Sequence, residues 1–247
     1  MVSFDGRQEG TPLEHWREDG RLDGLPALEL SVLSGVDRLL VVVAHADDET
    51  LGCGGTIALA RRFGTPVDVV VVTDGAAAHG AASPALARER ESEAAAALAE
   101  LGSGIGLSFL GVPDSATPEH RDRISAEVRS RASAPAGRVL LLSTWTGDGH
   151  RDHRVVGEVC AEAGAELGHP VLAAPVWLWH WSSPADESVP WPRLVRVELD
   201  EEMVARKARA LDRYPSQTSP GPDGAAVLHP RFLRAFAGDD HLVRVVP

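Results

Sequence analysis

The residues of this sequence that could carry chemistry gather where a run of branched apolar residues ends. The stretch LLVVVAHADDETLGCGG (39–55) places His45, Asp47, Asp48 and Glu49 directly after that run. Imidazole and carboxylate together are the ligands of a catalytic zinc or similar divalent ion, which typically takes three protein ligands and leaves one position for water. His45 and Asp48 can supply two of these ligands, so a third must come from elsewhere in the chain.

A second cluster offers that third ligand. The stretch LLLSTWTGDGHRDHRVVGEV (140–159) also passes from an apolar run into a polar, glycine-containing loop, with His150 and His153 at a helix start. Residues at i and i+3 share one helix face. If the two preceding strands are neighbours in a sheet, the clusters converge. We therefore predict a two-histidine, one-carboxylate site made by His45, Asp48 and either His150 or His153.

Each cluster alone has a simpler interpretation. Consecutive acids at a helix start interact favourably with the helix dipole, and the two later histidines alone are more often ordinary loop residues. GCGG (52–55) invites a dinucleotide-binding interpretation, but the G-x-G-x-x-G spacing directly after a strand is absent. These glycines are better explained by a helix that approaches the loop closely. The coincidence of two such clusters at two predicted strand ends favours the metal site.

The elements that must position these residues follow from the hydrophobic pattern. Unbroken apolar runs at 38–44, 67–75, 105–112 and 138–145 predict buried parallel strands. Helical patterns alternate with them at 54–64, 83–102, 117–133 and 153–168. Ser83–Pro84 and Thr117–Pro118 are typical helix starts. The fold class predicted is α/β: a single Rossmann-like domain with a mostly parallel sheet and helices on both faces. Such sheets bind ligands at the carboxyl ends of their strands.

We expect one domain over residues 1–247, with a core at about 38–217 and an N-terminal extension at 1–36. The C-terminal third is decorated: a Trp- and Pro-rich segment at 176–192, a strand at 194–199, a helix at 200–214 and an irregular tail at 215–247. The tryptophans of this segment alternate with other residues and could stack on sugar faces, but a half-buried strand face is the favoured interpretation. They are Trp177, Trp179, Trp181 and Trp191.

Composition limits the partners. The chain of 247 residues has a formal net charge of −12, which disfavours nucleic acid and anionic membrane as partners. No apolar run reaches the roughly 18 residues of a membrane span. Cys53 and Cys160 stand far apart with no CxxC spacing, so we expect buried free thiols in a reducing compartment. A cytoplasmic location follows from these expectations, whereas the oligomeric state does not follow from the sequence.

At this point the residues resemble a known family. AHADDETLGCGG (44–55) is similar to the A-H-P-D-D-E signature of the PIG-L/LmbE-like zinc-dependent de-N-acetylases, and GHRDH (149–153) is similar to their H-x-D-H motif. The family includes the de-N-acetylase of glycosylphosphatidylinositol synthesis and the mycothiol and bacillithiol pathway deacetylases. Weaker matches extend the resemblance over roughly 38–217. One departure is Ala46, which stands where the family has proline; because proline only stiffens the loop, the ligands are not put in doubt.

The resemblance implies a role for each of these residues. It assigns zinc to His45, Asp48 and His153; by their chemistry, histidine and carboxylate ligands also suit Fe²⁺. Asp47 would be the general base, and His150 would stand near the substrate carbonyl as a cation. Asp114 matches a position that contacts the sugar. From the chemistry we expect Asp152 to orient His150 and keep it protonated, and Glu49 to support a ligand or a loop amide.

The resemblance also implies the reaction. It is metal-dependent hydrolysis of an N-acetyl group from an N-acetylglucosamine-type amino sugar or glycoconjugate, by metal-activated water. Arg88 is a candidate substrate-binding residue and, like Arg90, could reach a phosphate or carboxylate, although a charged helix face is the simpler interpretation. Two alternatives stay open: an amidase with the same site that acts on a thiol conjugate or an acylated antibiotic glycoside, and a non-catalytic sugar- or nucleotide-binding α/β protein.

Overall fold

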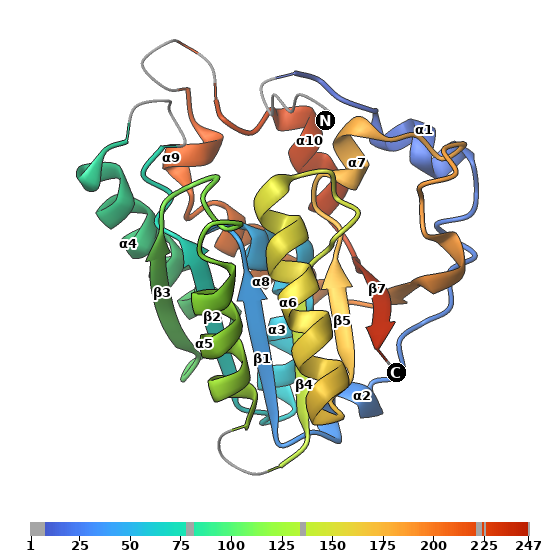
Figure 1. Ribbon diagram of the computed structural model, residues 1–247. Coiled ribbons are helices and arrows are strands. Elements are labelled where there is room, and N and C mark those ends of the chain that lie inside the picture. The colour runs from blue at the N-terminus through green and yellow to red at the C-terminus, as the bar shows by residue number, and fades with distance from the viewer. Residues whose placement is uncertain (1–7, 78–81, 134–136, 221–223, 225, 247) are drawn as a thin grey trace.

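The computed structural model describes residues 8–77, 82–133, 137–220, 224 and 226–246. At its centre lies a seven-stranded sheet with the strand order β3-β2-β1-β4-β5-β7-β6 (Figure 1). The strands are β1 Arg38–Val43, β2 Val67–Thr73, β3 Gly106–Val112, β4 Val139–Thr144, β5 Val171–Ala174, β6 Leu194–Val197 and β7 Asp240–Val246.

Strands β1 to β5 run parallel to one another, and β7 runs antiparallel to both β5 and β6. The sheet is therefore mostly parallel, as the sequence predicts. Strand β1 lies between β2 and β4, and residues 39–43 are buried because helices cover both faces of the sheet. Strand β3 is at the sheet edge, and its residues are mostly half-buried.

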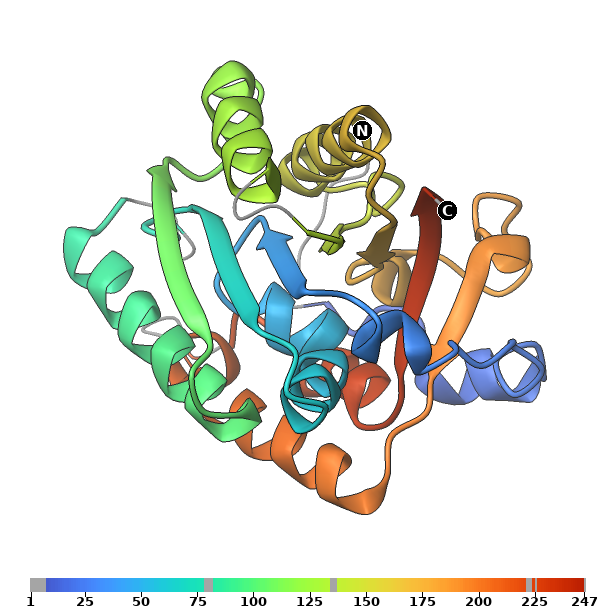
Figure 2. The same ribbon diagram turned by 90° about the horizontal axis from the view of Figure 1, so that it is seen from below.

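Two layers of helices enclose the sheet. Helices α3, α4 and α8 pack on one face, and α5 and α6 pack on the other (Figure 2). Their bounds are α3 Asp48–Arg62, α4 Pro84–Leu101, α5 Arg121–Ser133, α6 Arg151–Leu167 and α8 Glu201–Leu211. This arrangement confirms the predicted Rossmann-like α/β fold with helices on both faces.

Three helix starts differ from the sequence prediction. Helix α3 begins at Asp48, six residues before position 54, and α6 begins at Arg151 rather than 153. Helix α5 begins at Arg121 rather than 117. The Thr117 hydroxyl does not cap it, because that hydroxyl donates a hydrogen bond to Asp152 (2.7 Å). Ser83 caps α4 as predicted, by accepting a hydrogen bond from the Leu86 N–H.

The prediction of an irregular tail at 215–247 is wrong. This segment contains the short helices α9 Pro215–Thr218 and α10 Pro230–Leu233, the 3₁₀ turn η2 Arg234–Phe236, and β7. Strand β7 lies inside the sheet, between β5 and β6, rather than at its edge. Strand β5 was also not predicted, because its four residues fall where the regular alternation of strands and helices ends.

The tryptophan-rich segment is not a strand, so the favoured interpretation of its tryptophans is wrong. Residues 178–181 form the helical turn α7 Leu178–Trp181, and 191–193 form the 3₁₀ turn η1 Trp191–Arg193. Trp179 packs edge-to-face on Trp16 of the N-terminal extension, with ring centroids 5.1 Å apart. The extension contains α1 Leu13–Glu18 and α2 Ser31–Ser34.

The close packing of α3 explains its glycine-rich stretch. A Cβ on Gly52 would lie 2.6 Å from the Ala174 side chain, and one on Gly55 would lie 2.2 Å from Leu199. Helix α3 therefore packs closely against β5 and the segment before α8. Cys53 and Cys160 are both buried and free, as predicted. None of the helices in the described part of the chain combines the length and apolarity of a membrane span.

Candidate metal centre and active site

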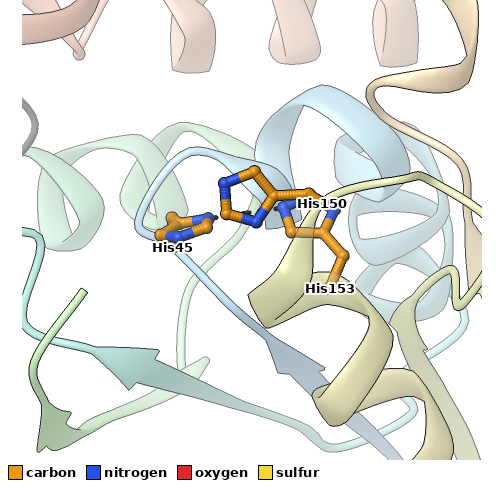
Figure 3. A group of neighbouring side chains, drawn as sticks. All are labelled: His45, His150 and His153. Atoms are coloured by element: carbon orange, nitrogen blue, oxygen red, sulfur yellow. Dashed lines mark hydrogen bonds between the residues drawn. The ribbon is translucent and has the colours of Figure 1, made fainter. Parts of the chain in front are cut away.

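The two polar clusters meet because β1 and β4 are neighbours in the sheet. His45, Asp47 and Asp48 follow the carboxyl end of β1, whereas His150 and His153 lie at the start of α6, after β4. Figure 3 shows the three histidine rings close together above these strand ends. His45 and His150 border a cavity of about 210 Å³ at the edge of the sheet where parallel strands bind ligands, and His153 lies buried behind them.

Three donor atoms form a nearly equilateral triangle. His45 Nδ1 lies 3.4 Å from Asp48 Oδ2, His153 Nε2 lies 3.3 Å from that oxygen, and the two nitrogens are 3.3 Å apart. Tetrahedral zinc, with metal–ligand distances of about 2.0–2.2 Å, separates its ligand atoms by roughly 3.3–3.5 Å. The triangle therefore fits one divalent ion without rearrangement.

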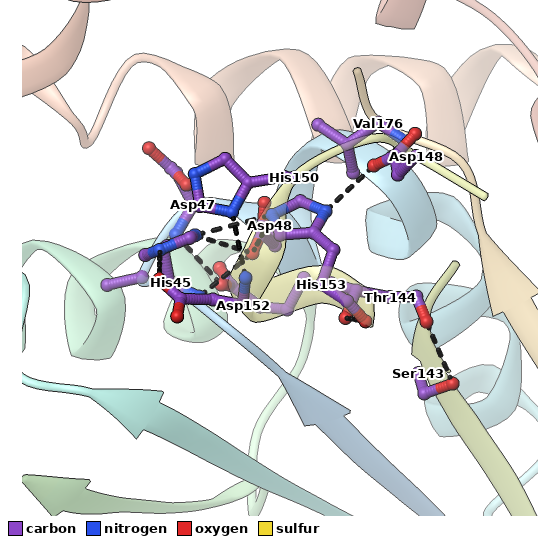
Figure 4. Close-up of polar contacts among 12 residues, drawn as sticks. His45, Asp47, Asp48, Ser143, Thr144, Asp148, His150, Asp152, His153 and Val176 are labelled. Atoms are coloured by element: carbon purple, nitrogen blue, oxygen red, sulfur yellow. Dashed lines mark hydrogen bonds and ion pairs between the residues drawn. The ribbon is translucent and has the colours of Figure 1, made fainter. Parts of the chain in front are cut away.

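A second observation supports the fit. The ring nitrogen of each histidine that points away from the triangle faces a buried carboxylate (Figure 4). His45 Nε2 lies 3.2 Å from Asp152, and His153 Nδ1 lies 2.7 Å from Asp148. Metal-binding histidines usually have such a partner, which fixes the ring and its tautomer. His150 also lies in this group, whose ligand atoms all lie within 4.8 Å of one another, but the Asp48 triangle is tighter.

The charges of the cluster are arranged for a cation. Burial alone would lower the pKa of both histidines, but the facing carboxylates raise the pKa of His45 to about 10 and that of His153 to about 9. Burial alone would raise the pKa of Asp48, yet His153 and His45 hold it well below its ordinary value. Three buried carboxylates, Asp48, Asp148 and Asp152, thus supply negative charge. Protons on the two histidines balance this charge here, and a bound divalent ion could balance it in their place.

Asp47 is adjacent to the ligand Asp48 but lies outside the triangle. It is buried and has the positive φ angle of 126°, which is uncommon for a residue with a side chain. Its Oδ2 accepts a hydrogen bond from Arg90 (3.2 Å), whose guanidinium also donates to the Ala46 carbonyl. Burial raises the pKa of Asp47 to about 7, although Arg90 opposes the shift. A carboxylate with this pKa is suited to general-base work near neutral pH.

Glu49 and Tyr214 hold this strained backbone in place. The Asp47 N–H donates to Glu49 Oε2 (3.0 Å), and the hydroxyls of Thr50 and Tyr214 both donate to Glu49 Oε1. Glu49 and Tyr214 are both fully buried. Glu49 therefore supports a loop amide, as predicted from the sequence. Tyr214 was not predicted; it follows α8 and lies 165 residues from its partner.

The structure corrects the expectation that His150 is a cation beside Asp152. Burial lowers the pKa of His150 to about 2, with the positive charges of His153 and His45 acting in the same direction. His150 Nδ1 accepts the backbone N–H of Asp152 (3.2 Å) rather than facing its carboxylate. That carboxylate instead faces His45 and accepts hydrogen bonds from Ser115 N (2.9 Å) and Thr117. The Asp152 carboxylate therefore orients His45, whereas the Asp152 backbone N–H contacts His150.

Asp148 is, with Tyr214, a site residue that was not predicted from the sequence. It is fully buried, and besides His153 it accepts hydrogen bonds from the N–H groups of Val176 (3.0 Å) and Leu178 (2.8 Å). Its position in GDGH, two residues before His150, was the available signal. Because two of its partners come from the segment after β5, the role could not be read from local spacing.

The two candidate substrate-binding residues have different positions. Asp114 lines the cavity, where its carboxylate accepts hydrogen bonds from Gly75 N (3.2 Å) and Ala77 N (2.8 Å). Arg88 is exposed on α4 and does not line the cavity. Arg90, two residues later, is only 3% exposed and does line it. The structure therefore brings Arg90 to the site in place of Arg88, and the charged-face interpretation of Arg90 is wrong.

Fold and site define a class: a mostly parallel α/β protein with a two-histidine, one-carboxylate centre and a second carboxylate beside it. The chain belongs to the GlcNAc-PI de-N-acetylase (PIG-L) family, which matches residues 40–164. The resemblance carried by AHADDE and GHRDH is thereby confirmed. Both motifs lie inside the matched segment, whereas the residues from 165 onward lie outside it.

Two curated relatives are similar to part of the chain. One is the 1D-myo-inositol 2-acetamido-2-deoxy-alpha-D-glucopyranoside deacetylase of Rhodococcus erythropolis, 31% identical over 60% of this chain and 58% of that protein. The other is the probable N-acetyl-alpha-D-glucosaminyl L-malate deacetylase 2 of Bacillus subtilis, 28% identical over 51% of this chain and 60% of that protein. The chain thus spans about three fifths of the length of these relatives.

Solved structures support the fold. The structure of a deacetylase–teicoplanin complex from the teicoplanin biosynthesis pathway superposes with a TM-score of 0.64 at 18% sequence identity, covering 85% of this chain and 98% of that one. The conserved protein TT1542 of Thermus thermophilus gives a TM-score of 0.56 at 24% identity, covering 86% and 96%. The likeness thus extends beyond the segment that matches the family.

Proposed function

We propose that this protein is a metal-dependent N-deacetylase that removes the acetyl group from an N-acetylglucosamine-type amino sugar or glycoconjugate. The observation that carries the proposal is the donor triangle of His45, Asp48 and His153, with the buried carboxylate of Asp47 beside it and outside the triangle. Both curated relatives are named as deacetylases of such sugars. Zinc is the proposed ion, because two histidines and one carboxylate with an open position suit it, and Fe²⁺ is the alternative.

The reaction adds water across the amide. A divalent ion at the triangle supplies Lewis acidity, which lowers the pKa of water and polarises a carbonyl. Asp47 takes a proton from the attacking water, whose oxygen forms the new bond to the acyl carbon. The C–N bond then breaks, and the same carboxyl returns the proton to the departing nitrogen. The products are a free amine and a carboxylate.

His150 acts as a neutral hydrogen-bond donor in this scheme. Because its Nδ1 accepts the Asp152 N–H, the ring proton resides on Nε2. In this scheme that N–H donates to the oxygen of the reacting carbonyl, where negative charge develops. Loss of one such donor typically lowers the rate about 100- to 1000-fold. The stacking of His150 with Trp177, with ring centroids 6.4 Å apart and planes inclined by 17°, holds the ring in place.

We assign Arg90, Asp114 and Ser115 to recognition of the sugar, because all three line the cavity. An amidase that acts on a thiol conjugate or an acylated antibiotic glycoside would use the same catalytic residues and differ only in the substrate. We also propose a cytoplasmic location, since both cysteines are free and free thiols persist in reducing compartments.

The test is elemental analysis of the purified wild type and of His153→Ala, with hydrolysis of a small N-acetylglucosaminide measured on both. We expect about one zinc or iron per wild-type chain, with the metal and the activity both lost in the variant. Exposed His15 provides a matched control, because His15→Ala removes a histidine remote from the cavity. Absence of metal from both proteins after dialysis against zinc would instead support the binding-protein interpretation.

A further inference from the structure

The cavity has two chemically different sides, and the order of the strands sets their positions. Strands β2 and β3 lie on one side of the β1–β4 pair that carries the metal centre, and β5 lies on the other (Figure 1). Arg90, Asp114 and Ser115 belong to the segments that follow β2 and β3. Val176 and Trp177 directly follow β5. The metal centre therefore lies between a polar side and an apolar side.

We call the apolar side the apolar wall; it consists of Leu51, Val176, Trp177, Val227 and Leu228, and the polar Gln217, whose carbonyl accepts the Leu228 N–H, lines the cavity beside it. The wall continues a buried hydrophobic cluster that extends to Trp16 and Phe236. Trp177 is fixed within it, because its ring stacks on Phe232 with centroids 4.9 Å apart and planes inclined by 10°. The apolar wall is thus a packed surface. It reaches His150 through Trp177, whose ring stacks on the His150 ring.

The shape of an amide relates these two sides to a substrate. A secondary amide is planar and almost always trans, so its acyl group and its nitrogen substituent extend in opposite directions. A sugar on the nitrogen carries hydroxyls that need hydrogen-bonding partners on burial, and the polar side offers Arg90 and Asp114. With the carbonyl at the metal centre and the sugar on that side, the acyl group extends toward the apolar wall.

An acetyl group would use little of this wall. Its single methyl would touch only the nearest part, whereas an acyl chain of four to six carbons would cover more of the apolar surface. Resting on the function proposed above, we propose that the protein prefers N-acyl amino sugars with an aliphatic acyl group of four to six carbons over the N-acetyl compound. Each additional buried methylene is worth roughly fourfold in kcat/KM.

The experiment measures amine release from one glucosaminide carrying N-acetyl, N-propionyl, N-butyryl or N-hexanoyl groups, using the metal-loaded protein. We expect kcat/KM to rise at least tenfold from the acetyl to the hexanoyl compound. If the acetyl compound is hydrolysed while kcat/KM falls with chain length, this inference is wrong and the proposed deacetylase function stands. If no member of the series is hydrolysed, the proposed function is wrong, and the inference fails with it.

A variant pair locates the preference in the wall. Val227→Asn replaces a half-buried apolar side chain by a polar one of similar size, and should lower the hexanoyl-to-acetyl ratio of kcat/KM at least fivefold. Val204→Asn makes the same change at a half-buried valine of α8, which lines a different cavity, and should leave the ratio unchanged. A Val227→Asn ratio equal to that of the wild type would overturn the assignment.

The same variant separates the acyl group from the group at the anomeric carbon. Methyl and octyl glycosides of the N-acetyl sugar are compared in both proteins. If Val227→Asn reduces the preference for the octyl glycoside and leaves the acyl series unchanged, the wall binds the aglycone and the inference is wrong. An unchanged glycoside preference combined with a reduced acyl preference supports it.

Discussion

The segment that matches the family and the C-terminal third contribute chemically different residues to one cavity. The metal triangle, Asp47 and His150 all come from residues 40–164. The apolar wall comes almost entirely from beyond residue 170, with Leu51 as its one member from the matched segment. In the proposed reaction, the matched segment supplies the reacting groups, while the C-terminal third supplies most of the apolar wall beside them.

The matched segment and the C-terminal third are not independent, because hydrogen bonds connect them at the site. Tyr214 from the C-terminal third donates to Glu49, which accepts the backbone N–H of Asp47, the proposed base. In the opposite direction, Asp148 of the matched segment accepts hydrogen bonds from Val176 and Leu178. The C-terminal third therefore also affects the geometry of the reacting groups.

The largest expected effect tests the matched segment itself. Asp47→Asn should lower kcat by about 100- to 10,000-fold, because the amide cannot take a proton from water, while the metal content stays at the wild-type level. Steady-state kinetics and elemental analysis measure the two quantities. Asp122→Asn, which changes an exposed aspartate of α5, is the control. A variant within threefold of the wild-type rate would show that Asp47 is not the base.

The next effect concerns a carboxylate that the C-terminal third holds in place. Asp148→Asn should weaken metal affinity about 10- to 100-fold, because the ring of His153 loses its charged partner. Competition with a chelator of known affinity measures this change. Asp186→Asn, remote from the cavity, should leave the affinity unchanged. Equal affinities in both variants would mean that Asp148 does not support the metal centre.

A smaller effect tests whether the C-terminal third acts on catalysis. Tyr214→Phe should lower kcat about tenfold with KM within twofold of wild type, since Glu49 loses one donor and the base becomes less well positioned. Thr218→Val also removes a hydroxyl, one that donates to the Tyr214 carbonyl and has no contact with Glu49; its kcat should be unchanged. A lower Tm with normal kcat in Tyr214→Phe would show that the hydrogen bond from Tyr214 to Glu49 is a purely structural contact.

The smallest effect is confined to the C-terminal third. Burial, together with Lys207, lowers the pKa of His241 to about 4. As the pH falls from about 6.5 to 4, the unfolded chain takes up a proton at this histidine and the folded chain does not, so the free energy of unfolding decreases. The full shift corresponds to at most about 3 kcal/mol, and the partial exposure of the ring reduces this to about 1.

His241→Gln should remove that loss. Denaturant unfolding at pH 7 and at pH 4.5 should show a smaller decrease in the variant than in the wild type. His15→Gln, at an exposed position, should behave like the wild type. Parallel pH dependence in all three proteins would contradict the assignment of this effect to His241.

Whether a feature could be predicted from the sequence depends on how far apart in the sequence the interacting residues lie. Local signals were sufficient for β1, for the cap at Ser83 and for the position of His45 and Asp48 after a buried strand. The Thr117 cap failed because a distant acid, Asp152, competes for the same hydroxyl. A tertiary contact of this kind outweighs a local preference.

The remaining errors also arise from contacts between distant parts of the chain. Strand β7 pairs with β5 about 70 residues earlier, and no local pattern marks that pairing. Whether the Asp152 carboxylate faces His150 or His45 depends on the backbone at the start of α6, where the Asp152 N–H already occupies His150 Nδ1. Arg88 and Arg90 look equivalent in sequence, and only the packing of α4 shows which one faces the cavity.

The position of β7 has a consequence for the order in which the molecule assembles. Among the described strands, β7 alone pairs with β6, which also forms an isolated bridge with Ala27, and β7 is made after β6. During synthesis on the ribosome, β1 to β5 can pair as they emerge, whereas β6 has no place in the sheet until β7 arrives. The reacting groups can therefore gather early, while the apolar wall and the Tyr214 contact depend on segments that emerge late. A truncated or stalled chain would then hold the catalytic residues without the surface proposed to select their substrate.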